Sequence, residues 1–241
     1  MIKSVPKRLF RKLAGKFLFP KVQFCYSQYG EDLIIAALLH RLSIHKPTYL
    51  DIGANEPRYI SNTYYFYEQG GNGVCVEPNP FLCNKLRKSR RGDIIINAGI
   101  GIDNTPEADF FLFPNYANGL STFSKKEALH WEEIGMQGLG KIKIEKIIKI
   151  PLININKILE DNFKTSPDLL SIDVEGWDNK ILQSLDFTKY KPKVICAETL
   201  LYDEYQKGYK TYDIESLLKN NGYMLYADTR VNSIFCLKEL I

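Results

Sequence analysis

The fold of this chain is indicated by the stretch Thr48-Tyr49-Leu50-Asp51-Ile52-Gly53-Ala54-Asn55, an apolar run that ends in an acid, a glycine and an amide. A second run of the same kind, Gly73-Val74-Cys75-Val76-Glu77, also closes on an acidic residue. A buried strand that ends in a glycine turn lets a ligand approach the backbone closely. An acid at the end of the next strand can accept hydrogen bonds from both hydroxyls of a ribose. The two turns therefore predict a site for an adenosine-type cofactor.

The first turn favours S-adenosylmethionine over a dinucleotide. A pyrophosphate-binding turn needs three spaced glycines before a helix N-terminus, whereas this turn offers Gly53 alone before Ala54 and Asn55. S-adenosylmethionine has no phosphate, so Asp51, Gly53 and Asn55 can receive its amino-acid end without a phosphate cradle. An ordinary strand-to-helix turn is the alternative interpretation.

The composition indicates one globular domain. Of the 241 residues, 45% are hydrophobic and 25% are charged, as is typical of soluble proteins. Outside its first residues the chain is close to neutral, which argues against a nucleic-acid partner. The five cysteines lack metal-ligand spacing, and their odd, scattered arrangement suits a reducing cytoplasm. We therefore expect a cytoplasmic protein.

Residues 1–25 form a basic N-terminal segment, and residues 26–241 are expected to form the single domain. Residues 1–21 hold seven basic residues and no acid. A helical wheel separates the apolar residues of this segment from most of the basic ones, so the segment predicts an amphipathic helix. Such a helix can lie on an anionic membrane surface, which would make the protein membrane-peripheral. Alternatively, the helix docks on its own domain or on a second copy of the chain in a homo-oligomer.

Strand-like runs alternate with helix-like stretches, an order typical of a parallel sheet with crossover helices. Parallel strands are expected at about 48–54, 74–77, 93–99, 168–173 and 193–198. Helices are expected at about 33–42, 61–69, 80–89, 179–185 and 212–221. Two closing runs, 223–228 and 233–238, are joined by a short turn and predict a hairpin with one antiparallel strand. The sequence thus predicts an α/β, Rossmann-like fold with a mostly parallel seven-stranded sheet and helices on both faces.

The pattern is broken after the third strand. Residues 101–165 carry two further strand-like runs, at about 110–113 and 143–150. An insertion at the ends of parallel strands is where a lid over the acceptor would lie. His130 lies in this insertion beside Trp131. It could act as a general base, or it could be a lone surface histidine.

Several motifs together resemble the FkbM family of S-adenosylmethionine-dependent methyltransferases. They occur in the order of the family at residues 26–32, 51–55, 76–80 and 171–178, followed by the run that ends in Glu198. The resemblance implies a class I methyltransferase fold with strand order 3-2-1-4-5-7-6. It also implies methyl transfer to an oxygen, on a sugar, a glycan or another small-molecule hydroxyl. The N-terminal segment and the insertion match the family less clearly.

The resemblance implies roles for the residues of the cofactor site. Asp51, Gly53 and Asn55 would hold the methionine side, and Glu77 would bind the ribose. Asn79 would flank the ribose or adenine, and the third strand would line the adenine with Asn97 and Ala98. The N-terminal signature is expected near the mouth of the site; its members are Gln28, Glu31 and Asp32. An alternative role for the two acids is to charge the N-terminus of the helix at 33–42.

Three carboxylates are expected where the fourth and fifth strands end. Asp173 and Glu175 follow the fourth strand and Glu198 ends the fifth. A hydroxyl is a poor nucleophile that needs a general base or a metal, so these three residues and His130 are the predicted catalytic residues. Asp173 is also expected to contact the cofactor. Asp173 and Glu198 together form a candidate Mg²⁺ site, because oxygen ligands suit that ion.

Two other functions fit part of the sequence. Glu77 would also suit the ribose of a nicotinamide-dependent oxidoreductase, although the single-glycine turn argues against it. A non-catalytic interaction module with a Rossmann-like fold is the second alternative. Nucleic-acid methylation is not favoured, because the sequence lacks an Asn/Asp-Pro-Pro-aromatic turn at the fourth strand. Binding of S-adenosylmethionine or of a nicotinamide nucleotide would separate these functions.

Overall fold

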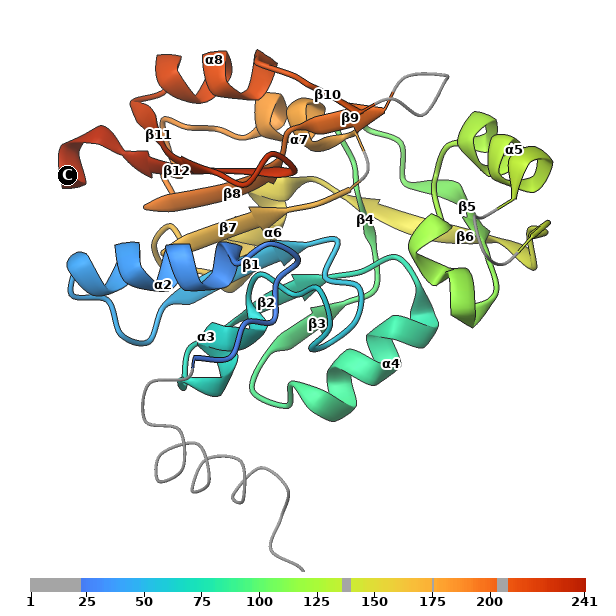
Figure 1. Cartoon of the computed structure of the whole chain (residues 1–241), viewed down its shortest axis with the longest axis horizontal. Coiled ribbons are helices and arrows are strands. Elements are labelled where there is room, and N and C mark those ends of the chain that lie inside the picture. The colour runs from blue at the N-terminus through green and yellow to red at the C-terminus, as the bar shows by residue number, and fades with distance from the viewer. Residues whose placement is uncertain (1–22, 136–139, 175, 203–207) are drawn as a thin grey trace, which may run out of the picture.

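The computed structural model describes residues 23–135, 140–174, 176–202 and 208–241 (Figure 1). Their centre is a seven-stranded sheet with the order β11-β12-β8-β7-β1-β2-β3. Five strands are parallel: β1 (Thr48–Ile52), β2 (Asn72–Val76), β3 (Ile94–Ile96), β7 (Leu169–Ile172) and β8 (Val194–Glu198). The closing hairpin of β11 (Tyr223–Asp228) and β12 (Asn232–Leu237) supplies the strand that is antiparallel to β8. Numbered within this sheet alone, the strands follow the predicted order 3-2-1-4-5-7-6.

Helices cover both faces of the sheet, as predicted (Figure 1). One face is covered by α2 (Glu31–Arg41), α3 (Tyr64–Glu68) and α4 (Pro80–Ser89). The other face is covered by α6 (Ile155–Asn162), α7 (Asp178–Ser184) and α8 (Asp213–Asn220). A short 3-10 helix, η2 (Lys238–Leu240), ends the chain. None of the helices among the described residues is long and apolar enough to cross a membrane.

The apolar strands are continuous because both of their sides are buried. In β8, Ile195 and Ala197 join the core under α6, α7 and α8, whereas Val194 and Cys196 join the core under α2 and α3. A central strand of a parallel sheet has no solvent-facing side, so its sequence does not alternate between apolar and polar residues. This is why the strands of the sheet were recognisable from apolar runs.

The predicted insertion forms a side lobe on a small sheet of its own. The side lobe consists of β5 (Glu107–Leu112), β6 (Lys146–Ile153), the 3-10 helix η1 (Asn115–Leu120) and α5 (Lys125–Ile134). The short strand β4 (Gly99–Ile100) pairs with β6 and connects the lobe to β3. The lobe has a separate core that includes Phe111, Phe113 and Ala128. The end of the predicted insertion, residues 155–162, instead forms α6 and packs on the main sheet.

A buried ionic network lies on the α3–α4 face of the sheet. Arg90, which follows α4 and is fully buried, donates from Nε to Asp93 Oδ2 at 2.7 Å and from Nη2 to Thr63 Oγ1 at 2.8 Å. Its Nη1 lies 3.6 Å from Asp51 Oδ2. Asp93 also accepts a hydrogen bond from the Tyr49 hydroxyl at 2.8 Å. The network thus joins β1 to the entrance of β3 and to the start of α3.

We expect Arg90→Met to destabilise the fold by about 3–5 kcal/mol, because a buried carboxylate that loses its partner is strongly destabilising. Methionine keeps most of the side-chain volume but leaves Asp51 and Asp93 without a cation. Urea unfolding measures the difference. The matched control is Arg91→Met at the exposed neighbouring position, which we expect to change stability by no more than about 0.5 kcal/mol. Equal stability of the two variants would contradict the structural role of the network.

Candidate active site

The turn after β1 is fixed by a close approach of two strand ends. Gly53 has a φ of 80°, and a Cβ placed on it would lie 2.0 Å from the backbone oxygen of Asp173. The Asp173 amide in turn donates to the oxygen of Ile52 at 3.1 Å. Asn55 also has a left-handed backbone, with a φ of 46°. A side chain at Gly53 would therefore separate the predicted cofactor turn from the end of β7.

Glu77 joins the two predicted cofactor turns. Its Oε2 accepts a hydrogen bond from the Asn55 amide at 2.9 Å, and its Oε1 accepts one from the Asn79 amide at 2.7 Å. Its side chain is only 5% exposed. Burial raises the pKa of Glu77 to about 7, although the two backbone donors oppose this shift. The carboxylate thus lies between the turns, where a ribose could complete its hydrogen bonds.

The neighbouring amide residues hold the second turn in place. The Asn79 Oδ1 caps α4 by accepting from the Phe81 amide at 3.0 Å. Asn97, after β3, donates from Nδ2 to the backbone oxygens of Glu77 and Pro78 at 3.0 and 2.8 Å. Ala98 is fully buried beside it. The structure therefore brings Asn55, Glu77, Asn79 and Asn97 together, and gives Asn79 and Asn97 structural contacts that the sequence did not predict.

The Asp51 side chain points into the core rather than toward the turn. It accepts a hydrogen bond from the Thr63 hydroxyl and pairs with Arg90. Burial raises the pKa of Asp51, and the Arg90 charge opposes that shift. Asp51 lies two residues after Tyr49, which packs on the same face of β1. Contact with the methionine end of the cofactor stays a prediction for Asp51.

The acids of the N-terminal signature hold the start of the described chain, at residues 26–32, against the closing hairpin of the sheet. Glu31 is fully buried and accepts hydrogen bonds from the Thr229 hydroxyl at 2.7 Å and from Asn232 Nδ2 at 3.1 Å. Asp32, also fully buried, accepts from the Tyr26 amide at 2.7 Å. Gln28 is exposed. The two acids therefore do more than charge the N-terminus of α2, because they fix the loop before it.

Asp173 and Glu198 end adjacent parallel strands. The pairing of Ile172 with Ala197 makes them the next residues at the carboxyl edge of the sheet. Glu198 is 8% exposed, whereas Asp173 is half-buried. No residue among those that the structure describes donates a hydrogen bond to the Asp173 carboxylate. Burial, with the carboxylates of Asp51 and Glu31, raises the pKa of Asp173 to about 6.

The other predicted catalytic and metal positions receive less support. Glu175 lies outside the described residues. His130 lies in α5, half-buried beside Trp131, and Figure 1 shows α5 on the side lobe, apart from the ends of β7 and β8. The structure therefore does not group His130 with Asp173. Within the described ranges, no group of three or more His, Cys, Asp or Glu residues could hold a metal ion, so the candidate Mg²⁺ pair gains no third protein ligand there.

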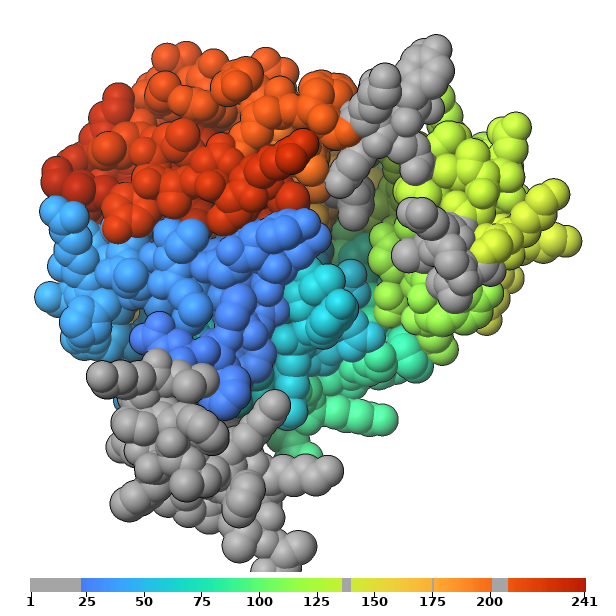
Figure 2. All heavy atoms as spheres, viewed as in Figure 1, coloured from blue at the N-terminus to red at the C-terminus, as the bar shows by residue number. Residues whose placement is uncertain are grey.

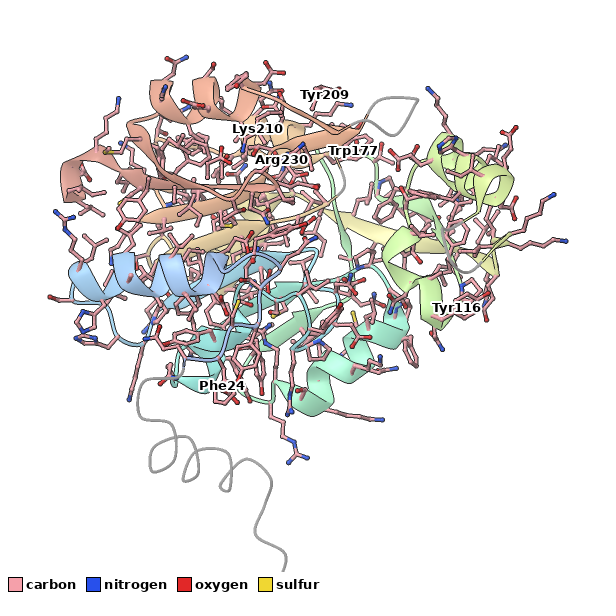
Figure 3. The ribbon with its side chains drawn as sticks, in the orientation of Figure 1. Phe24, Tyr116, Trp177, Tyr209, Lys210 and Arg230 are labelled. Atoms are coloured by element: carbon pink, nitrogen blue, oxygen red, sulfur yellow. The ribbon has the colours of Figure 1, made fainter. Side chains whose placement is uncertain are left out.

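A hollow that the sequence did not predict lies beside the carboxyl ends of β7 and β8. Figure 2 shows the molecule hollowed between the side lobe and the main sheet. Trp177, labelled in Figure 3, is 39% exposed. The Lys180 Nζ lies 4.2 Å from the centre of its ring. A cavity of about 130 Å³ lies next to it, lined by Gly176, Asp178, Asn179, Lys180, Glu198, Thr211, Asp213 and Ile214. The sequence signal nearest to this cavity is the tryptophan just after the fourth strand, but its exposure is visible only in the folded chain.

The strand order, with the antiparallel β12 beside β8, is that of the class I methyltransferase fold. The chain matches the model of the methyltransferase FkbM domain over residues 51–225. It therefore belongs to the FkbM methyltransferase family and is an S-adenosylmethionine-dependent methyltransferase. The family match decides against a nicotinamide-dependent oxidoreductase and against a non-catalytic module.

Other comparisons add little to the family match. No curated protein matches the chain. Solved structures with partial similarity include a TehB-like SAM-dependent methyltransferase from Corynebacterium glutamicum, with 10% identity, a TM-score of 0.43, and coverage of 95% of this chain and 97% of that one. An O-methyltransferase from Bacillus cereus in complex with SAH has 9% identity and a TM-score of 0.40, with coverage of 98% and 91%. A 1,6-didemethyltoxoflavin-N1-methyltransferase from Burkholderia thailandensis has 10% identity and a TM-score of 0.40, with coverage of 98% and 90%. The family match alone supports the assignment.

We expect the affinity for S-adenosylhomocysteine to increase with pH. The pKa of Glu77 is about 7 in the free protein, and hydrogen bonds from ribose hydroxyls favour the ionised carboxylate. Binding is therefore coupled to loss of a proton and should be about tenfold tighter at pH ~8 than at pH ~6. Calorimetric titrations between pH ~6 and pH ~8 measure how the affinity changes with pH.

Glu77→Gln tests whether Glu77 is the group whose ionisation makes the affinity for S-adenosylhomocysteine depend on pH. Glutamine cannot accept hydrogen bonds from both the Asn55 and Asn79 amides, because its amide nitrogen is a donor. We expect at least about tenfold weaker binding and no dependence on pH in this range. Glu56→Gln, next to the same turn, should keep the slope. A slope that survives in Glu77→Gln would show that another group titrates.

Proposed function

We propose that this enzyme transfers a methyl group to the hydroxyl of a sugar, glycan or other small molecule, with Asp173 as the general base. The observation that carries the proposal is the Asp173 carboxylate, which lies at the carboxyl edge without a hydrogen-bond donor among the described residues. Its backbone contacts Gly53 in the cofactor turn. A pKa of about 6 keeps the carboxylate ionised at neutral pH and more basic than an ordinary aspartate.

Different residues of the chain have different roles in methyl transfer, which is an in-line displacement. S-adenosylmethionine supplies an electrophilic methyl carbon on a sulfonium. Glu77 and the turn at Gly53 and Asn55 would hold the cofactor beside the carboxyl end of β7. Asp173 accepts the hydroxyl proton while the acceptor oxygen bonds to the methyl carbon and the carbon–sulfur bond breaks. Glu198 accepts a hydrogen bond from a second hydroxyl and fixes the acceptor.

The surroundings of Asp173 suit a polyhydroxylated acceptor. The adjoining cavity offers the oxygen atoms of Glu198, Thr211 and Asp213, which can accept hydrogen bonds from sugar hydroxyls. Trp177 offers an exposed aromatic ring of the kind that stacks on a sugar face. The side lobe lies across the hollow in Figure 2 from the carboxyl edge of the main sheet, and it would cover the acceptor.

Two further points belong to this proposal. A Mg²⁺ ion held by Asp173 and Glu198 would be a second way to lower the pKa of the attacking hydroxyl. All five cysteines are free, and four of them are buried, which supports placement in a reducing compartment such as the cytoplasm.

Asp173→Asn should reduce kcat by at least about 100-fold, because it removes the general base. The affinity for S-adenosylhomocysteine should change by no more than about threefold, because asparagine keeps the backbone contact with Gly53 and keeps a side-chain oxygen that can accept a hydrogen bond from the cofactor. In the wild type, kcat/KM should fall as the pH falls below about 6, because Asp173 becomes protonated. Transfer of a labelled methyl group to a panel of sugars, with and without EDTA, measures these rates.

The control for this experiment is Asp186→Asn, an exposed aspartate that follows α7. It should leave the rate and the pH profile unchanged. A full rate for Asp173→Asn would falsify the base assignment, and a full rate in EDTA would remove Mg²⁺ from the mechanism. Methylation of an amine in preference to every hydroxyl tested would overturn O-methylation.

A further inference from the structure

Helix α4 carries an unusual concentration of positive charge. Residues 80–91 contain five basic residues and no acid. Arg90 is buried in the ionic network, whereas Arg87, Lys88 and Arg91 are exposed and Lys85 is half-buried. Four cations of this short segment therefore reach the surface, and the catalytic site described above uses none of them.

Two of these cations line a surface hollow. The hollow has a volume of about 340 Å³ and is lined by Glu56, Pro57, Arg58, Tyr59, Lys85, Lys88 and Ser89. Arg58 contacts the end of α4, where its Nε donates a hydrogen bond to Ser89 Oγ at 3.2 Å. Glu56 pairs with Lys85 and is the one acid among the lining residues. Arg58 and Lys88 therefore give the hollow a net positive charge.

Large apolar side chains surround this charge. Tyr59 is 73% exposed, Ile60 is 44% exposed and Phe81, on the first turn of α4, is 42% exposed. The Lys85 Nζ lies 4.9 Å from the centre of the Phe81 ring. Exposed aromatic and aliphatic side chains among basic ones are typical of surfaces that lie at the boundary between lipid headgroups and acyl chains.

The start of the described chain adjoins this surface. The Arg58 guanidinium lies 5.3 Å from the centre of the Tyr64 ring, and that ring packs edge-on against Tyr26 at 4.8 Å. In Figure 1 the described chain begins beside α3, on the face of the sheet that α4 also covers. The sequence that precedes it contains seven basic residues and no acid through residue 21. The basic sequence thus joins the fold next to the α4 hollow.

We propose that the α4 hollow and its apolar rim dock on an anionic phospholipid bilayer. A bilayer can bind both the basic hollow and its apolar rim. Headgroup phosphates would contact Arg58 and Lys88. The side chains of Tyr59, Ile60 and Phe81 would enter the interface between headgroups and acyl chains. A soluble phosphate would leave the exposed rim in water. A nucleic acid would leave the exposed aliphatic Ile60 in water. The proposal does not depend on methyl transfer, since the surface lies outside the catalytic residues.

Co-sedimentation with vesicles tests the proposal with the full chain. The vesicles contain equal parts of phosphatidylglycerol and phosphatidylcholine, and vesicles of phosphatidylcholine alone serve as the uncharged comparison. We expect Arg58→Gln/Lys88→Gln to weaken partitioning to the anionic vesicles about 25-fold, because each basic side chain near such a surface contributes about fivefold. Tyr59→Ser should weaken the binding that persists at high salt, where electrostatic attraction is screened.

The matched control is Lys125→Gln/Lys126→Gln, which removes the same charge from exposed positions of α5 on the side lobe. We expect this control to change partitioning less than about twofold, because its cations lie far from the docked face. Circular dichroism and S-adenosylhomocysteine binding verify that all variants fold. Equal losses for the two double variants, or no loss for the α4 variant, would overturn the proposal. So would complete displacement from vesicles by inorganic phosphate or by duplex RNA at constant ionic strength, which would indicate a soluble anion or a nucleic acid as the ligand.

Discussion

The absence of a side chain at Gly53 is the constraint on which the site depends. Any Cβ there would meet the backbone oxygen of Asp173 at 2.0 Å, so only glycine lets β1 and β7 end in contact. This contact sets the distance between the turn that receives the cofactor and the carboxylate proposed to take the proton. Glu77 extends the same arrangement to β2 by accepting hydrogen bonds from both turns. The predicted cofactor turns and the proposed base therefore follow the ends of three adjacent strands of one sheet.

Most of the fold could be predicted because its strands are buried on both sides. Apolar runs located all seven strands of the main sheet, and α4 has the predicted limits, with Asn79 as its cap. The side lobe was less predictable, although local signals existed. Ser124 accepts a hydrogen bond from the Glu127 amide, a Ser-x-x-Glu pattern that marks the start of α5. Asn154 caps α6, where Ile155, Ile158 and Leu159 have helical spacing.

The candidate site was predictable where a role follows from position along a strand. Glu77, Asp173 and Glu198 lie at the strand ends where the sequence placed them. The direction of a side chain was not predictable in the same way. Asp51 lies one residue before the end of β1 and faces the core, because alternate residues of a strand point to opposite faces. The cavity beside Trp177 combines the β7 turn with residues 211–214, and only the folded chain brings these segments together.

The buried network and the catalytic edge are linked through charge. Asp51 contributes to the raised pKa of Asp173 by repulsion between the two carboxylates, and Arg90 opposes the protonation of Asp51. Arg90 therefore acts on this edge indirectly: it favours the ionised form of Asp51, and the Asp51 carboxylate in turn raises the pKa of Asp173. Burial is the largest cause of the Asp173 pKa of about 6, and repulsion from the carboxylates of Asp51 and Glu31 adds to it. An arginine that is expected to stabilise the sheet thus also influences, through Asp51, the residue proposed to accept the proton.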